Sequence, residues 1–239
     1  MLSRPRSTNC AICQGTDGSQ ETPLTPCVGH FCGVLETRPY MRAQSAFIHA
    51  LMDVDSRESV PMQLDHAREM LRLCRGDNVG IRDAIPEAML QLGMDQECFD
   101  FLTLGANAFE PVDYLCHRFL LVCFGAGMML IKVRMLLDLK DLQNSITSAI
   151  TETLNRRDLI VVLCSLEFQV KKLYKAIQSW NNFLGGALLE PDEHLHDMPG
   201  YFSAGDITEV QVILRYIYPA WAMTPGALEM VEDITKGKM

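Results

Sequence analysis

The chain has 239 residues, of which 48% are hydrophobic and 21% are charged, and its formal net charge at neutral pH is −9. This much apolar material can bury one large core or two modest ones, which excludes a disordered chain. An acidic balance argues against nucleic acid as the main ligand, because the neutralisation of phosphates requires a basic surface.

Residues 1–32 form a cysteine-rich N-terminal segment. Cys10 and Cys13, and then Cys27 and His30, are each separated by two residues, which lets one turn supply two ligands to a tetrahedral Zn²⁺. The sequence therefore predicts one zinc ion at most, with Cys32 as an alternative ligand. Free thiols on a flexible arm are the open alternative. The first residues lack the apolar core of a signal peptide, so we expect an intracellular protein, cytoplasmic or nuclear.

Four apolar stripes with helical spacing follow. They run from Tyr40 to Leu51, from Val60 to Cys74, from Ile81 to Leu92 and from Cys98 to Leu102. Gly76 and Gly93 are the expected helix ends, and Asp95 is an expected cap. The stripes predict two tetratricopeptide-like helical hairpins, although a plain helical bundle would carry the same pattern.

Three further patterns in the second half of the chain are helical. The apolar run 119–131 is too short to span a membrane and predicts a buried helix. Apolar steps of four and three from Leu159 to Leu184 predict a long helix that ends at Gly185-Gly186. Its seam packs within the chain, or alternatively in an intermolecular coiled coil. The capping-box spacing of Asp206 and Glu209, and the cap pair Thr224-Pro225, predict two terminal helices.

The predicted fold class is all-α, because no segment shows the alternation of a strand. We expect tetratricopeptide-like hairpins packed into an α-α bundle or solenoid over residues 33–239, preceded by the cysteine-rich segment. Five cysteines fall on apolar stripes, where we interpret them as buried thiols of a reducing compartment, not as a disulfide framework. These are Cys74, Cys98, Cys116, Cys123 and Cys164.

Arginines at helical spacing mark a candidate partner-binding face. They lie on the first two predicted helices, and a groove lined by guanidinium groups could bind the carboxylates of a partner protein. A solvated helix face is the alternative. The arginines are Arg38, Arg42, Arg68, Arg72 and Arg75. His194 and His196, among acidic residues of an expected loop, are a weaker metal candidate.

The segment CAICQGTDGSQETPLTPC (10–27) resembles the opening of a MYND zinc finger. The chain from Gly29 onward resembles fungal proteins in which such a finger precedes a tetratricopeptide-like domain, most strongly over residues 29–43 and 71–83. The finger is truncated here, since only Cys10, Cys13 and Cys27 match its ligand pattern. The resemblance implies a module for binding other proteins and brings no catalytic activity.

The expected function is that of a non-enzymatic scaffold or adaptor, in which helical hairpins present a groove to a peptide or helix of another protein. One alternative is a zinc-binding module whose residues 10–30 make the contact. Another is an enzyme with a Cys-His pair among His66, Cys74, Cys116 and His117. We expect a monomer or weak dimer that binds neither nucleic acid nor membrane.

Overall fold

The computed structural model describes residues 28–106, 122–148, 156–197 and 199–238. In these ranges the regular structure consists of α-helices and short 3-10 helices, with an isolated β-bridge between His30 and Cys74. The predicted all-α class is therefore confirmed. The chain divides into two compact units, Met1–Ala88 and Met89–Met239, whereas the sequence analysis placed a single boundary after residue 32.

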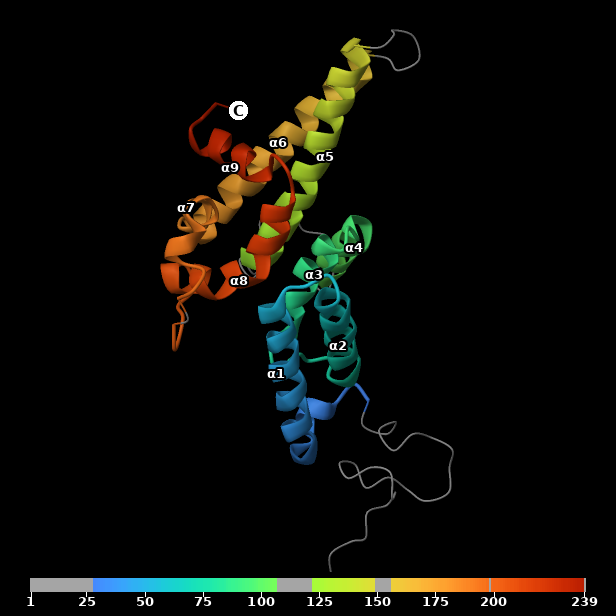
Figure 1. Cartoon of the computed structure of the whole chain (residues 1–239), viewed down its shortest axis with the longest axis vertical. Helices are drawn as coiled ribbons and strands as arrows, with labels where there is room; N and C mark the ends of the chain where they lie inside the picture. Colours follow the sequence, from blue (N-terminus) through green and yellow to red (C-terminus); the bar gives the residue numbers. More distant parts are fainter. Residues whose placement is uncertain (1–27, 107–121, 149–155, 198, 239) are drawn as a thin grey trace, which may run out of the picture. The chain divides into compact units, whose positions relative to one another are not determined.

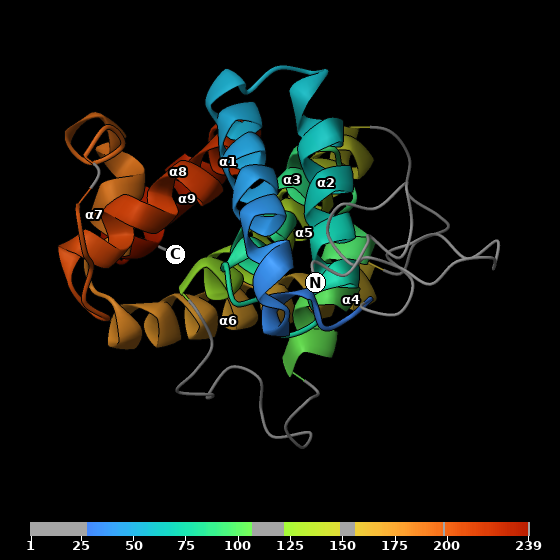
Figure 2. The ribbon, with the colours of Figure 1, turned by 90° about the horizontal axis from the view of Figure 1, so that it is seen from below.

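The first unit is built on a helical hairpin. Helices α1 (Arg38–Val54) and α2 (Ser59–Leu73) lie side by side, joined by a short turn (Figure 2). The predicted stripe of α2 is confirmed at Val60, Leu64 and Ala67, whereas Leu71 is only partly buried and Met70 and Leu73 are buried instead. The predicted buried face of α1 is wrong, because Met41, Ser45 and Ile48 are buried while Phe47 is 41% exposed. Phe47 instead rests edge-on against the His66 ring, 4.9 Å away, at the edge of the hairpin.

A short segment before α1 closes the open end of this hairpin. It comprises η2 (Phe31–Gly33) and η3 (Leu35–Thr37), with Phe31 fully buried and in edge contact with Tyr40. The Thr37 hydroxyl bonds the Phe31 and Val34 carbonyls, which holds the segment in a tight turn. The start of α1 is therefore anchored by contacts of its own before it meets α2.

The chain leaves α2 through a turn that begins the next element. The Asp77 carboxylate accepts hydrogen bonds from the backbone N–H groups of Ile81 (2.9 Å) and Arg82 (2.8 Å). These bonds satisfy donors at the start of η4 (Ile81–Ala84), as a capping carboxylate does. The sequence analysis predicted a helix end near Gly76 but not this cap.

The second predicted hairpin is present only in part. Helix α3 (Ile85–Gln91) begins in the first unit and ends in the second, and α4 (Asp95–Ala106) follows it. Gly93 adopts φ +71° between them, as expected of a glycine that ends a helix. Since α3 has 7 residues against the 17 of α1, this pair does not repeat the α1–α2 hairpin, and the tetratricopeptide-like arrangement is not confirmed.

The second unit is organised on a long helix pair. Helices α5 (Val122–Ser148) and α6 (Arg156–Trp180) run antiparallel along each other (Figure 1). The first ten residues of α5 are buried, which agrees with the predicted central helix. The predicted seam of α6 is confirmed from Leu159 to Ile177. None of the helices in the described ranges is long and apolar enough to cross a membrane.

Helix α6 ends at Trp180, earlier than predicted, and the cause is a buried asparagine. Asn181 donates to the Asp206 carbonyl (2.8 Å) and to the Glu209 carboxylate (2.9 Å), and its side-chain oxygen accepts from the Phe183 N–H (3.0 Å). These bonds hold the chain in a turn directly after Trp180, so the helix cannot continue. The predicted stop, Gly185-Gly186, lies inside the next helix, α7 (Leu184–Leu189).

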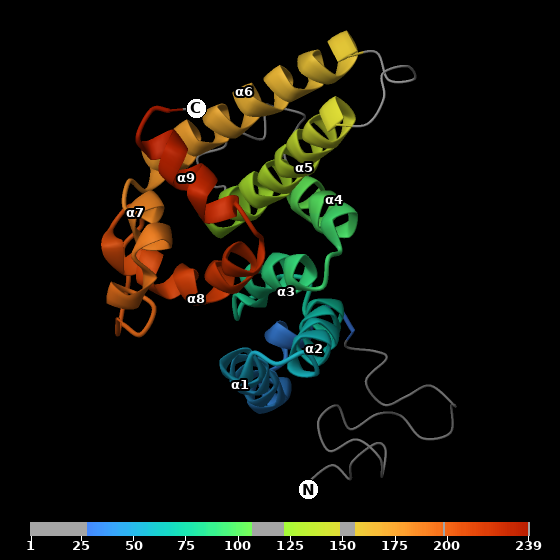
Figure 3. The same cartoon turned by 45° about the horizontal axis from the view of Figure 1, so that its top comes forward.

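The last helices gather on the half of the pair where α5 begins and α6 ends (Figure 3). They are α7, α8 (Ile207–Met223) and α9 (Ala227–Thr235), with η5 (Pro191–Glu193) after α7. Asp206 caps α8 as predicted, by accepting from the Ile207 N–H. Helix α9 starts two residues later than the predicted proline position, after Gly226 with φ +82°.

Candidate partner-binding site

The arginines predicted to bind a partner all lie in the first unit, on the α1–α2 hairpin. Arg38 and Arg42 are exposed near the start of α1, and Arg68, Arg72 and Arg75 are exposed in the second half of α2 or just after it. The start of α1 lies beside the end of α2, because the two helices form a hairpin. The structure thus brings the five residues onto one part of the fold.

One of these arginines is already engaged within the hairpin. Arg72 binds Glu69 through both arms of its guanidinium group, with Nε and Nη2 each 2.6 Å from a carboxylate oxygen. These hydrogen bonds lower the pKa of Glu69 and raise the pKa of Arg72. A partner carboxylate would have to displace Glu69 from this fork, so Arg72 is a weaker anchor than its position in the sequence suggests.

The predicted zinc ligands fall mostly outside the described part of the chain, which begins at residue 28. Cys10, Cys13 and Cys27 lie before it, while His30 is exposed. The alternative ligand Cys32 forms a disulfide with Cys74 and offers no thiolate while that bond stands. Within the described ranges, no group of three or more His, Cys, Asp or Glu side chains is arranged to hold a metal ion.

The cysteine predictions need two corrections. Cys74 is not a free buried thiol, because Cys32 and Cys74 are brought together by the closing segment of the hairpin. Cys164 is free but exposed, since it lies on the outer side of α6, away from the buried seam. Cys98 and Cys123 are buried and in no disulfide, as predicted, and Cys116 lies outside the described residues.

The predicted Cys-His pairs do not form a nucleophile site in the described residues. Cys74 is bonded in its disulfide, and the His66 ring is in edge contact with Phe47. Cys116 and His117 are outside the described ranges. His194 is partly buried and His196 is exposed, without the metal-ligating group that their spacing suggested.

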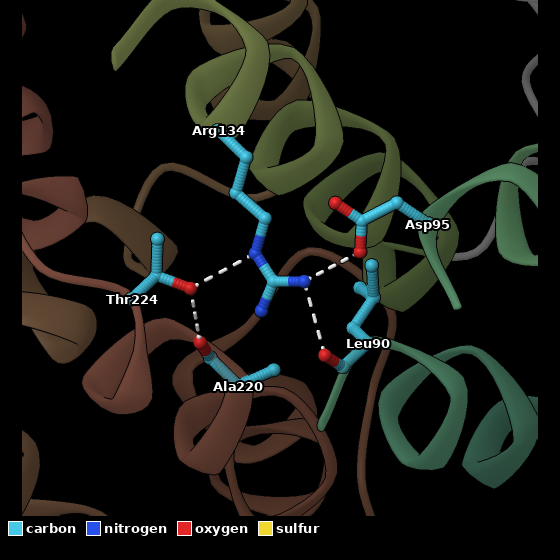
Figure 4. A network of polar contacts seen from close by, with 5 residues as sticks. All are labelled: Leu90, Asp95, Arg134, Ala220 and Thr224. Carbon is cyan, nitrogen blue, oxygen red and sulfur yellow. Dashed lines mark hydrogen bonds and ion pairs between the residues drawn. The ribbon is translucent and has the colours of Figure 1, made fainter. Parts of the chain in front are cut away.

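A polar network in the second unit was not predicted from the sequence. The Arg134 side chain, 17% exposed, donates through Nη1 to the Leu90 carbonyl (3.0 Å) and to the Asp95 carboxylate, and through Nε to the Thr224 hydroxyl (3.0 Å) (Figure 4). Thr224 in turn donates to the Ala220 carbonyl (2.8 Å). This network joins three chain segments through bonds within the protein, so we interpret it as structural rather than as a binding site.

The second unit also carries an open groove of about 500 Å³ between the end of α7 and α9. This volume is in the range of about 300–1,000 Å³ that is usual for ligand sites. Leucines from both helices and a set of carboxylates line it. The lining residues are Leu189, Glu190, Leu228, Glu229, Glu232, Thr235 and Lys236.

The groove has an excess of negative charge. Three glutamates face one lysine, and that lysine is already paired with Glu232, a contact that lowers the pKa of Glu232. Glu190 and Glu229 are exposed at its rim. The wall is fixed by the Thr235 hydroxyl, which lies 3.0 Å from the Tyr174 hydroxyl of α6 and donates to the Val231 carbonyl. The result is a partly apolar, negatively charged groove, one wall of which is held by hydrogen bonds to α6 and within α9.

Comparisons with known proteins give no relative: no family model, no curated protein and no solved structure matches this chain. The resemblance to MYND-type proteins and the zinc ion therefore stay predictions. What the chain binds has to be argued from the geometry of its surfaces.

Proposed function

We propose that this protein is a non-enzymatic interaction protein that binds a polypeptide segment of another protein on its helical surface. The observation that carries the proposal is the α7–α9 groove, which is lined by two half-buried leucines and by three glutamates, of which Glu190 and Glu229 are exposed. An amphipathic helix lays its apolar side chains into such a groove while its charged residues meet the rim. The rim is acidic, so the partner segment is basic.

The size of the groove sets what it accommodates. About 500 Å³ holds a few side chains, not a whole domain, so a short helix or extended peptide is the matching ligand. Leu189 and Leu228 supply apolar contact, and Glu190 and Glu229 supply charge. Exposed ion pairs add modest affinity and mainly set the choice of partner.

The arginine face of the first unit is the second candidate surface for the same function. Arg38, Arg42 and Arg75 are exposed there, and a partner with carboxylates would be the complement. The two surfaces have opposite charge, so the charge of the peptide that binds more tightly distinguishes between them.

The test is binding of two fluorescein-labelled amphipathic helices, one of leucine and lysine and the other of leucine and glutamate, measured by fluorescence anisotropy on the full chain. The lysine helix should bind, and its affinity should fall as salt is raised. The double variant Glu190→Lys, Glu229→Lys should lose about tenfold in affinity. Lys236→Gln, which frees Glu232, should bind more tightly.

A matched control keeps the overall charge change but spares the groove. Glu36→Lys with Glu58→Lys alters two exposed carboxylates that do not line it. If this control loses as much affinity as the groove variant, the lysine helix binds by net charge alone and the groove is not the site. Preference for the glutamate helix would move the proposal to the arginine face.

A further inference from the structure

The disulfide Cys32–Cys74 joins the two chain segments that flank the α1–α2 hairpin. Its cysteines are 42 residues apart in the sequence, with Cα atoms 5.8 Å apart. Cys32 lies in the segment before α1, and Cys74 is the residue that ends α2. The helices are already joined at their other end by the turn after α1, so the disulfide converts the hairpin into a closed ring.

Backbone hydrogen bonds lie beside the disulfide. The Gly29 N–H donates to the Leu73 carbonyl (2.9 Å), and the Arg75 N–H donates to the Gly29 carbonyl (3.2 Å). Phe31 adds a fully buried side chain. Each such hydrogen bond contributes only about 0.5–1.5 kcal/mol, so the covalent bond adds substantially to the closure of the ring.

The two cysteines differ in exposure. Cys74 is 3% exposed, whereas Cys32 is partly exposed, so an external thiolate approaches the disulfide from the Cys32 side. Attack at Cys32 makes Cys74 the leaving group. Thiol–disulfide exchange requires such access to one of the two sulfur atoms.

The remaining cysteines of the described ranges are consistent with a reversible bond. Cys98 and Cys123 are in no disulfide, and Cys164 is an exposed free thiol. A disulfide framework of a secreted domain pairs its cysteines throughout, whereas here one pair coexists with an exposed thiol.

We propose that Cys32–Cys74 is a redox latch that a low-molecular-weight thiol such as glutathione opens and its disulfide closes. In opening, one glutathione thiolate attacks the Cys32 sulfur, forms a mixed disulfide and releases the Cys74 thiolate, which takes up a proton. A second glutathione thiolate attacks the glutathione sulfur of the mixed disulfide and releases Cys32. The cysteine pair gains two electrons and two protons, and two glutathione molecules become one glutathione disulfide. Closing reverses these steps.

Opening the latch frees the segment around Gly29–Thr37 from the end of α2 and loosens the backbone after Arg75. Arg38, Arg42 and Arg75 flank this joint, so the redox state controls how the arginine face is presented. The latch does not depend on the proposed peptide groove, which lies in the other unit.

The test equilibrates the full chain in glutathione buffers of graded redox potential, then traps thiols with N-ethylmaleimide and quantifies labelling of Cys32 and Cys74 by mass spectrometry. Both residues should become labelled together, with the transition inside the buffered range. In parallel, trypsin cleavage after Arg75 should become about tenfold faster on reduction. Cleavage after Lys236 should not change and serves as the internal control.

Variants separate the latch from general damage. The double variant Cys32→Ser, Cys74→Ser should be cleaved under both conditions as fast as the native chain with its disulfide reduced. Cys164→Ser should behave as the native chain. Circular dichroism verifies that each variant remains helical. Free Cys32 and Cys74 thiols in excess glutathione disulfide would overturn the proposal. So would a bond that persists through the whole range, or equal cleavage after Arg75 in both states.

Discussion

The guanidinium group of Arg134 lies 2.5 Å from the Asp95 carboxylate, and this pair joins the middle of α5 to the first residue of α4. Arg134 also bonds the carbonyl that closes α3 and the hydroxyl that follows α8. A single side chain thus fixes loops on either side of the central helix. Loops held by buried hydrogen bonds to charged groups lose stability when the donor is removed.

Replacing Arg134 should destabilise the second unit. Arg134→Ala removes the charged donor to the Leu90 carbonyl, the Asp95 carboxylate and the Thr224 hydroxyl, and we expect a loss of about 2 kcal/mol in the free energy of unfolding. Urea unfolding followed by circular dichroism measures it. Lys140→Ala is the matched control, because Lys140 makes only an exposed ion pair with Glu167 at 3.2 Å, worth about 0–1 kcal/mol. Equal losses in the two variants would contradict the role assigned to Arg134.

Gly125 permits close packing of α5 on α6. A Cβ at this position would lie 3.0 Å from Trp180 and 3.2 Å from Ile177. Alanine gains up to about 1 kcal/mol in helix propensity, but overpacking costs about 1–3 kcal/mol, so Gly125→Ala should lower the melting temperature. Gly186→Ala meets nothing within 4 Å and should raise it. Thermal melts of both variants test whether the two melting temperatures shift in opposite directions. Shifts in the same direction would refute the packing argument.

Asn181 should contribute more to the stability of the fold than its neighbour Asn182. Asn181 is 1% exposed and makes three hydrogen bonds, whereas Asn182 is exposed. We expect Asn181→Ala to cost about 2–3 kcal/mol, because it leaves the Phe183 N–H without its acceptor and removes the buried amide donor to the Asp206 carbonyl and the Glu209 carboxylate. Asn182→Ala should change stability by less than about 0.5 kcal/mol. Denaturant titration of the pair decides whether the buried amide or the loop sequence as a whole redirects the chain.

The Glu69–Arg72 pair predicts a small acid dependence. The pKa of Glu69 is lowered in the folded state, so the folded chain binds this proton less readily than the unfolded chain. The pair therefore stabilises the hairpin above the unfolded pKa, and the stabilisation is lost as pH falls through the lower folded pKa. Native protein should melt at a higher temperature than Glu69→Gln near neutral pH, with the difference shrinking in acid. An unchanged difference at low pH would exclude this linkage.

The sequence predicted helices better than it predicted contacts between them. The seam of α6 and the buried start of α5 are visible as periodic apolar positions, because burial of one helix face imposes a local spacing. The buried face of α1 is not visible in this way, since Ser45 is buried while Phe47 packs at the surface. The early end of α6 depends on Asn181 finding partners in α8, and such long-range hydrogen bonds leave no periodic signal.

The candidate sites show the same limit. The arginine face was predictable because its residues recur at helical spacing, but the engagement of Arg72 depends on one carboxylate three residues away. The disulfide joins cysteines 42 residues apart, and the groove combines α7 with α9. Neither relation is encoded in a local motif, so both required the fold.

The most direct test of the proposed function is hydrogen–deuterium exchange of the full chain with and without a saturating leucine–lysine amphipathic helix. If the groove binds the peptide, exchange should slow in Leu184–Leu189 and Ala227–Thr235, the helices that line it. The α1–α2 hairpin should exchange as before. Unchanged exchange in α7 and α9 at saturation, or slowing confined to the hairpin, would contradict the assignment of the groove as the binding site.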